Sequence, residues 1–354
     1  MKKLIFIILF IIILTPRVYA ELDWQLSGYP EFNEYAEKLA AGENPLTPQS
    51  VLTSLTDALF GEVIRSKALL AEIMTIAAAA GLLKLMDRGG GVGEAAYFTS
   101  YTLMSAAVVK LLGETAGYGS EVIHSVCEFI TVLAPVLMGL MAASGAVTSA
   151  TAFSPILSGA VYLFTLAVDR LITPMIYMSA VLGIVGNISG RVQLGSFNRL
   201  LRSVSRWILT AIFTVFTSLC ALYGFNAPVL DALGAKTAKF AIGTLVPVVG
   251  GLLADTIETV IGGTRILKNA VGSAGMICVV IITAAPVIKV WVVLFLLRLC
   301  AALSEPLCDK RMSSMLQDAS ESVGIIFSVM LTAVMLFLIS IGIMLGSTGL
   351  GQGG

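Results

Sequence analysis

The chain has 354 residues, of which 57% are apolar and 12% are charged, and its mean hydropathy is +0.93. A soluble domain carries about a quarter charged residues, so this composition excludes an ordinary soluble globular protein and indicates a polytopic membrane protein. Lysine plus arginine and aspartate plus glutamate number 22 each, so the net charge favours no nucleic-acid surface, and we expect no nucleic-acid partner.

Residues 1–20 have the form of a signal peptide. Lys2 and Lys3 precede an apolar run from Leu4 to Leu14, and Val18-Tyr19-Ala20 supplies small residues near a cleavage point. The run is short for a membrane span and typical of a secretory leader. We therefore expect cleavage after Ala20; an uncleaved anchor would leave the following segment on the same outer side.

Residues 21–67 are the main extended polar segment. Its acids outnumber its basic residues, which are Lys38, Arg65 and Lys67, and this scarcity is typical of a translocated segment. Thr47-Pro48 has the form of a helix cap and first position, and leucines then recur at helical spacing. We expect an extracytoplasmic acidic segment with an amphipathic helix, whose apolar stripe packs on its own domain, on lipid or on an outer partner.

Residues 68–346 form the predicted multi-span membrane domain, and residues 347–354 a Gly-rich tail. Apolar runs predict spans at 69–85, 95–112, 122–143, 153–188, 207–223, 238–254, 270–297 and 323–345. The run 153–188 is too long for one crossing and is split by Asp169-Arg170, so it is a helical hairpin or one tilted span with an interfacial extension. The predicted fold class is all-α: a polytopic membrane helical bundle of about seven to nine membrane elements.

Arginines in one short loop determine the expected orientation. Arg191, Arg199, Arg202 and Arg206 precede Trp207, and uncompensated arginines in a short loop belong on the cytoplasmic side. Counting crossings from an outer N-terminus places Ser144 in the cytoplasm and an acidic loop, residues 114–121, outside.

The run 238–254 differs from the other predicted spans because it is interrupted. It has only 17 residues, contains Pro247, Gly250 and Gly251, and follows Lys236 and Lys239. Proline and paired glycines in so short a run indicate a broken or re-entrant helix. Such backbone is tolerated at membrane depth only where protein or a watery cavity covers it, so we expect the other spans to shelter it.

Lys289 is the clearest charge inside a predicted span, and Pro286 lies three residues before it. A charge at the bilayer centre costs at least about 2.5–3.5 kcal/mol, so it requires a partner or water. Asp255 and Glu258 lie on one helical face just past the interrupted run. Pairing of Lys289 with one of them is a hypothesis; otherwise these acids are boundary charges, interhelical ion pairs or the ion ligands of a transporter.

No catalytic constellation is recognisable in the sequence. His124, Cys127 and Glu128 share a helical face, but one histidine and one cysteine do not make a closed metal site, so a local helix-face pair is expected. The five cysteines form no CxxC pair and are expected to pack as small apolar residues. We therefore expect no enzymatic activity, no cofactor and no metal site.

Several strings between residues 230 and 311 resemble the stage III sporulation protein AE family. In order they are Lys236-Thr-Ala-Lys239, Val246-Pro247-Val-Val-Gly250, Leu267-Lys268-Asn269-Ala-Val-Gly272, Ala285-Pro286-Val-Ile-Lys289 and Glu305-Pro306-Leu-Cys-Asp309-Lys-Arg311. The length, leader and hydropathy of the whole chain are compatible with that family. Candidate assembly or pore-lining residues are Lys236, Lys239, Pro247, Gly250, Gly251, Asp255, Glu258, Lys268, Asn269, Pro286, Lys289, Pro306, Asp309 and Arg311.

The resemblance implies a non-enzymatic membrane subunit of a secretion-like channel complex that links mother cell and forespore during sporulation. It implies a place in the mother-cell membrane around the forespore, and support of forespore development and late gene expression there. The implied partners are the lipid bilayer, other stage III sporulation A-operon proteins and stage II sporulation protein Q, with a homo-oligomer left open. The alternative is a stand-alone secondary transporter with its site at the interrupted run 238–254.

Overall fold

The structure is a computed structural model that describes residues 48–86, 92–188, 195–245, 250–306, 308 and 310–346. The predicted signal peptide, residues 21–47 of the predicted outer segment, Pro247, Asp309 and the Gly-rich tail lie outside the described residues.

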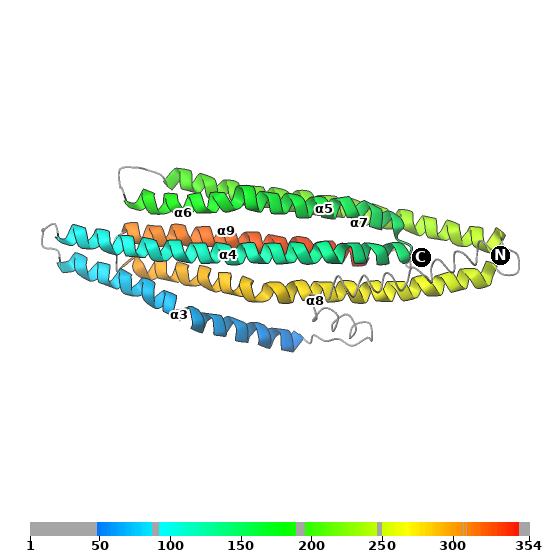
Figure 1. Cartoon of the computed structure of the whole chain (residues 1–354), viewed down its shortest axis with the longest axis horizontal. Coiled ribbons are helices and arrows are strands. Elements are labelled where there is room, and N and C mark those ends of the chain that lie inside the picture. The colour runs from blue at the N-terminus through cyan, green and yellow to red at the C-terminus, as the bar shows by residue number, and fades with distance from the viewer. Residues whose placement is uncertain are drawn as a thin grey trace.

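Every regular element among the described residues is helical, which confirms the all-α fold class. The elements are α3 (Pro48–Met86), α4 (Val92–Ala143), α5 (Val147–Ala167), the π-helical turn η1 (Val168–Ile172), α6 (Thr173–Ile188), α7 (Gly195–Leu245), α8 (Gly250–Ser304) and α9 (Lys310–Gly346). α5, η1 and α6 follow one another without a gap and form one rod. Figure 1 shows the rods side by side along the long axis, each running opposite to the rod before it. Short connections between antiparallel neighbours are typical of helix bundles.

The rods are much longer than a bilayer is thick. α4, α7 and α8 contain 52, 51 and 55 residues, so each is roughly 75–85 Å long, against a hydrocarbon layer of about 30 Å. Five described helical stretches are long and apolar enough to cross a membrane: Tyr97–Ala143, Val147–Gly186, Gly195–Gly224, Thr259–Ser304 and Lys310–Gly346. The multi-span membrane bundle is therefore confirmed, with five candidate spans where seven to nine membrane elements were predicted.

Two of the predicted spans are one helix. The runs 95–112 and 122–143 both lie in α4, and the predicted acidic loop 114–121 is helical. Charges separate apolar runs in a hydropathy profile, but Lys110 and Glu114 are spaced four residues apart, a separation that a continuous helix accommodates. The crossing count that placed Ser144 in the cytoplasm is wrong, because it used that loop as a turn. The run 153–188 is likewise no hairpin, since the π turn leaves the rod continuous.

The interrupted run 238–254 is the end of a helical hairpin. α7 ends at Leu245 and α8 begins at Gly250, and the two helices pack together in opposite directions (Figure 1). A proline lacks a backbone N–H and disfavours helix at the preceding residue, which accounts for separate helices on either side of Pro247. The predicted interruption of this run is therefore confirmed, since α7 and α8 are separate helices, and its place at membrane depth stays a prediction.

The last helix, α9, is the most buried rod and packs against α4, α6, α7 and α8. Its residues Leu336 and Phe337 are fully buried. Glycines on α8 let the rods approach closely: a Cβ at Gly272 would collide with the Leu345 side chain of α9, and one at Gly275 with Leu133 of α4. The core therefore lies along α9, where apolar residues on all sides suit a central position.

The connection between α4 and α5 is a tight helix-terminating turn. Gly145 has a φ of +90°, which favours glycine. The N–H of Ala146 donates to the carbonyl of Met141, and the N–H of Gly145 donates to the carbonyl of Ala142. This pair of bonds is the Schellman arrangement, which satisfies carbonyls at the end of α4 and reverses the chain.

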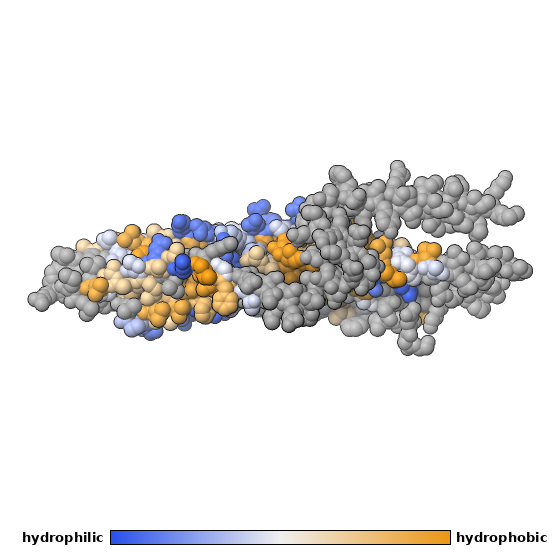
Figure 2. Space-filling view, turned by 90° about the horizontal axis from the view of Figure 1, so that it is seen from below, coloured by the Kyte–Doolittle hydropathy of each residue, from blue (hydrophilic) through white to orange (hydrophobic). Residues whose placement is uncertain are grey.

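Much of the described surface is apolar. Figure 2 shows orange hydrophobic areas interrupted by blue hydrophilic patches along the bundle. Large apolar side chains on α5, α6 and α7 are exposed, among them Tyr162, Val181, Trp207 and Val215. A soluble bundle would not leave so many apolar groups to water, so lipid or protein must cover part of this surface.

Candidate functional site

The predicted site residues do not form one cluster. Lys236 and Lys239 lie in the last turns of α7, and Gly250, Gly251, Asp255 and Glu258 in the first turns of α8. The side chains of these residues lie outside the part of the chain that the structure describes. Pro306 and Arg311 are exposed at the α8–α9 connection. The whole length of α8, about 80 Å, separates the two groups.

Lys268 is a cap for the C-terminus of α9. Its side chain is fully buried, and its Nζ donates hydrogen bonds to the backbone carbonyls of Met344 at 3.1 Å and Leu345 at 2.9 Å. The last carbonyls of a helix have no partner within the helix and carry partial negative charge, so a cation satisfies both needs. Asn269, the next residue, is exposed. Lys268 therefore faces the interior of the bundle, and its described role is to hold α8 to α9.

Asp231 of α7 caps the N-terminus of α5 by accepting hydrogen bonds from its first backbone N–H groups. Its Oδ1 accepts the N–H of Thr148 at 2.7 Å, and its Oδ2 accepts the N–H of Ser149 at 2.9 Å and the Ser149 hydroxyl at 2.5 Å. Our sequence analysis missed this residue. The available signal was that α5 begins after Ala146, which has no side-chain oxygen to cap its own helix.

Lys289 lies over an aromatic ring of a neighbouring rod. Its Nζ is 3.7 Å from the ring centroid of Tyr118 on α4, which is a cation–π contact. Pro286 lies inside α8 one turn earlier, and the helix continues through it. Asp255 and Glu258 are 34 and 31 residues away on this same helix, roughly 45–50 Å at 1.5 Å per residue. The hypothesis that Lys289 pairs with one of them inside the chain is therefore wrong.

Arg202 is a buried cation at the centre of a charged network whose acids are partly exposed. The residue is 3% exposed, its Nη2 lies 2.8 Å from Asp318 Oδ1, and its Nε lies 3.2 Å from Glu321 Oε2. Its Nη1 also donates to the backbone carbonyl of Asp318 at 3.1 Å. These bonds join α7 to α9. Sequence reasoning assigned Arg202 only to a basic loop, because nothing in one sequence pairs it with acids more than a hundred residues later.

A second polar contact extends this network to α6. Ser179 of α6 donates a hydrogen bond to the amide oxygen of Asn198 on α7, and both residues are buried. A Cβ at Gly183 of α6 would lie 3.1 Å from Asp318 Cβ and 3.4 Å from Asn198 Nδ2. Three rods thus meet around one acid, and the small residue on α6 makes room for it. A network of this kind sets the register of packed helices, because a shifted rod would leave its charges unpaired.

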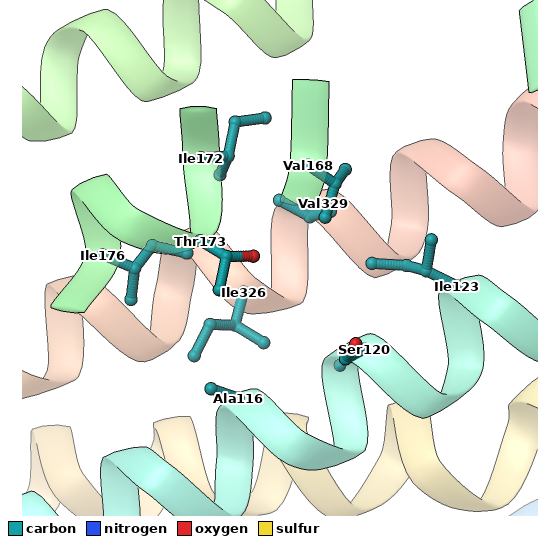
Figure 3. Close-up of a pocket in the computed structure, with 10 residues that line it drawn as sticks. Ala116, Ser120, Ile123, Val168, Ile172, Thr173, Ile176, Ile326 and Val329 are labelled. Atoms are coloured by element: carbon teal, nitrogen blue, oxygen red, sulfur yellow. The ribbon is translucent and has the colours of Figure 1, made fainter. Parts of the chain in front are cut away.

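The π turn faces a small cavity between α4, α6 and α9. Its volume is about 20 Å³, room for roughly one water molecule. Figure 3 shows the lining side chains converging from three rods, with Ala116, Ser120 and Ile123 on α4, Val168, Ile172, Thr173 and Ile176 on η1 and α6, and Ile326 and Val329 on α9. The lining is mostly apolar, so this cavity is too small and too apolar to hold a substrate.

The predicted helix face of His124, Cys127 and Glu128 contacts the neighbouring rod. His124 Nε2 lies 3.9 Å from Asp169 Oδ1 in the π turn, with both side chains about half exposed. The Cys127 thiol lies 3.6 Å from the Thr165 hydroxyl. Within the described ranges no group of three or more His, Cys, Asp or Glu side chains is placed to hold a metal ion. These contacts join α4 to the α5–α6 rod.

Comparison with known proteins gives one consistent result. The family described as Stage III sporulation protein AE matches residues 30–348. The stage III sporulation protein AE of Bacillus subtilis (strain 168) is 29% identical over 307 residues, which is 86% of this chain and 77% of that protein. No solved structure matches the chain. Because the family match covers almost the entire chain, including all the rods described above, the protein belongs to the stage III sporulation protein AE family.

Proposed function

We propose that this protein is a non-enzymatic membrane subunit of a multi-protein, secretion-like channel complex that links mother cell and forespore during sporulation. The complex would support forespore development and late gene expression in the forespore. The observation that carries the proposal is the family match over residues 30–348, which includes all five helical stretches able to cross a membrane.

The proposed location is the mother-cell membrane that surrounds the forespore, with the N-terminal segment on the extracytoplasmic side. The proposed partners are other stage III sporulation A-operon proteins, stage II sporulation protein Q and further copies of the same chain. The exposed apolar residues on several rods support an assembly, because a bundle of this length has more apolar surface than one bilayer covers.

The use of the charged groups also supports a structural role. Lys268, Asp231 and Arg202 each form bonds between two rods, so these three charges hold helices together. A secondary transporter places broken helices and their ion ligands near the middle of the membrane. The α7–α8 break lies at the end of two antiparallel rods, so the alternative of a transporter site at residues 238–254 has no geometric support.

Co-isolation from sporulating cells tests this proposal. An affinity-tagged full-length chain replaces the native one in its host, is extracted in mild detergent and is analysed for other stage III sporulation A proteins and stage II sporulation protein Q. A late forespore-specific reporter is measured in the same cells. We expect co-isolation of these partners and loss of the reporter when the chain is deleted.

Two arginines on one helix provide a matched pair of variants. Arg202→Met removes the buried cation of the network, whereas Arg199→Met removes an exposed cation one turn away, which donates a hydrogen bond to the Ser196 hydroxyl. We expect Arg202→Met to reduce co-isolation and reporter output, and Arg199→Met to leave both unchanged. A purified monomer that transports a solute in liposomes and co-isolates with none of these proteins would contradict the proposal.

A further inference from the structure

One level of the bundle is defined by the two helix caps. Asp231 bonds to the first residues of α5, and Lys268 bonds to the last carbonyls of α9. A Cβ at Gly145, in the α4–α5 turn, would lie 4.0 Å from Ile261 of α8. α4, α5, α7, α8 and α9 are thus brought together at this height, which we call the cap level.

A second level is defined by charged contacts nearer the middle of the bundle. His124 of α4 contacts Asp169 of η1, and Lys289 of α8 lies over Tyr118 of α4. A Cβ at Gly119, beside Tyr118, would meet Ile326 of α9. On α7 and α9, Arg202 pairs with Asp318 and Glu321. These contacts occupy a zone of about 20 Å, from Asp169 to Gly183 on the α5–α6 rod, which we call the charged belt.

Between the two levels, each of five rods has an interval without charged residues. The charge-free intervals are residues 129–143 in α4, 149–168 in α5 and η1, 207–230 in α7, 269–288 in α8 and 322–345 in α9. Four of them are 20 to 24 residues long, which is about 30–36 Å of helix, and the interval in α4 is shorter because Glu128 extends the belt by one turn. The hydrocarbon layer of a bilayer is about 30 Å thick.

We propose that one bilayer surrounds the bundle only between the charged belt and the cap level. α4, α5, α7, α8 and α9 each cross it once. Most of α3 and the α3–α4, α6–α7 and α8–α9 connections project from one face of the membrane. Val92–Glu121 of α4 has 30 residues, so this projecting part is about 45 Å long.

α3 and the arginines before Trp207 are then on the same side, so an extracytoplasmic N-terminal segment and the expected cytoplasmic arginine loop exclude each other. The α4–α5 connection lies at the opposite face, and the end of α7 and the start of α8 extend beyond it by about 20–27 Å.

Hydropathy alone does not choose between the two halves of the rod formed by α5, η1 and α6. Val147–Gly186 is 40 residues long, about twice what one crossing needs. Its second half lies beside the charged network, because Ser179 bonds to Asn198 and Gly183 adjoins Asp318. Its first half faces charge-free intervals on its neighbours. A charge at the centre of the hydrocarbon layer costs at least about 2.5–3.5 kcal/mol, so the bilayer belongs around the first half.

Trp207 fits the edge of this layer. It directly follows Arg206, is 72% exposed, and starts the charge-free interval of α7. Tryptophan is enriched where a membrane meets water, because its ring is apolar and its N–H is polar. This placement depends on the positions of charges in the fold, and it holds whether or not the proposed function is correct.

Spin labels on a single rod test the placement. Leu163→Cys and Val181→Cys introduce labelling sites at two residues of one rod that are 57% and 58% exposed. The full chain is purified and reconstituted in vesicles of phosphatidylethanolamine and phosphatidylglycerol. Collision rates with oxygen, which concentrates in lipid, and with a water-soluble nickel chelate are then measured by electron paramagnetic resonance. The parent chain, labelled in parallel, gives the signal of its own five cysteines.

We expect the label at residue 163 to collide mainly with oxygen. The label at residue 181 should collide with the nickel chelate at least tenfold more often than the label at residue 163 does. Leu200→Cys and Val215→Cys, which are 54% and 59% exposed on α7, repeat the comparison on a second rod, with Val215 inside the layer. Oxygen-dominated collisions at residue 181 would place lipid around the charged network and overturn the proposal. Low collision rates with both reagents at residue 181 would also overturn it, because that residue would then be covered by protein.

Discussion

Lys268→Met is the sharpest test of how the rods are joined. The substitution keeps most of the apolar volume and removes the ammonium that bonds to the carbonyls of Met344 and Leu345. Both carbonyls then lack this donor in a site that excludes water, since Lys268 is fully buried. We expect the bundle to lose stability and the last turn of α9 to loosen.

The magnitude follows from the number of bonds. A hydrogen bond to a charged group contributes about 1.5–3 kcal/mol net, while side-chain hydrogen bonds measured inside membranes average about 0.6 kcal/mol. Two such bonds therefore give about 1 to 6 kcal/mol. We take about 3 kcal/mol, which corresponds to roughly a hundredfold shift in the folding equilibrium.

The assay is unfolding of the purified full-length chain by SDS in mixed micelles, followed by tryptophan fluorescence. Asn269→Met, at the exposed neighbouring residue, is the control and should change stability by less than about 0.5 kcal/mol. Hydrogen exchange of the amides at the end of α9 should be faster in Lys268→Met than in the control. A Lys268→Met protein as stable as Asn269→Met, with unchanged exchange in α9, would refute the cap.

The other contacts between rods give three further predictions in the same assay. Asp231→Ala removes the acceptor for the first amides of α5 and should cost about 1–2 kcal/mol of folding stability. Ser149→Ala should cost less in the Asp231→Ala protein than in the parent protein. Equal costs in the two backgrounds would count against a bond between these two side chains. Arg202→Met removes a buried cation from two partly exposed acids, which water can solvate in its place, and should cost about 1–3 kcal/mol, while Arg199→Met should stay within about 0.5 kcal/mol; equal effects would disprove the network. Tyr118→Phe should keep the contact with Lys289, and Tyr118→Leu should lower the folding stability by about 0.5–1 kcal/mol. The Tyr118→Leu loss should disappear in a Lys289→Met background, and a loss of the same size there would exclude the cation–π contact.

The fold class could be predicted from the sequence, because 57% apolar and 12% charged residues leave few alternatives to a membrane bundle. The positions of the helix ends could not be predicted from the sequence. Hydropathy separated 95–112 from 122–143 at Glu114 and Glu121, yet α4 continues through them. A charge stops an apolar run without stopping a helix, because a charged side chain removes no backbone hydrogen bond.

The partners of the candidate residues could not be predicted from the sequence either. Lys268 was named from a family resemblance, but its role depends on carbonyls 76 and 77 residues later. Lys289 was matched with Asp255 and Glu258, and a continuous α8 keeps those acids far away. Partners on other rods depend on the packing order of the bundle, and one sequence contains no direct signal for that order.

The position of α9 determines when the bundle can be completed. α9 leaves the ribosome after all the other described helices, yet it supplies the carbonyls for Lys268 and the acids for Arg202. Until it is inserted, the earlier rods carry two cations whose counterparts have not been synthesised, and the face that α9 will fill is open. A chain cut short before Lys310 would keep both faults permanently, so quality-control proteases have a physical basis for distinguishing it from the finished protein.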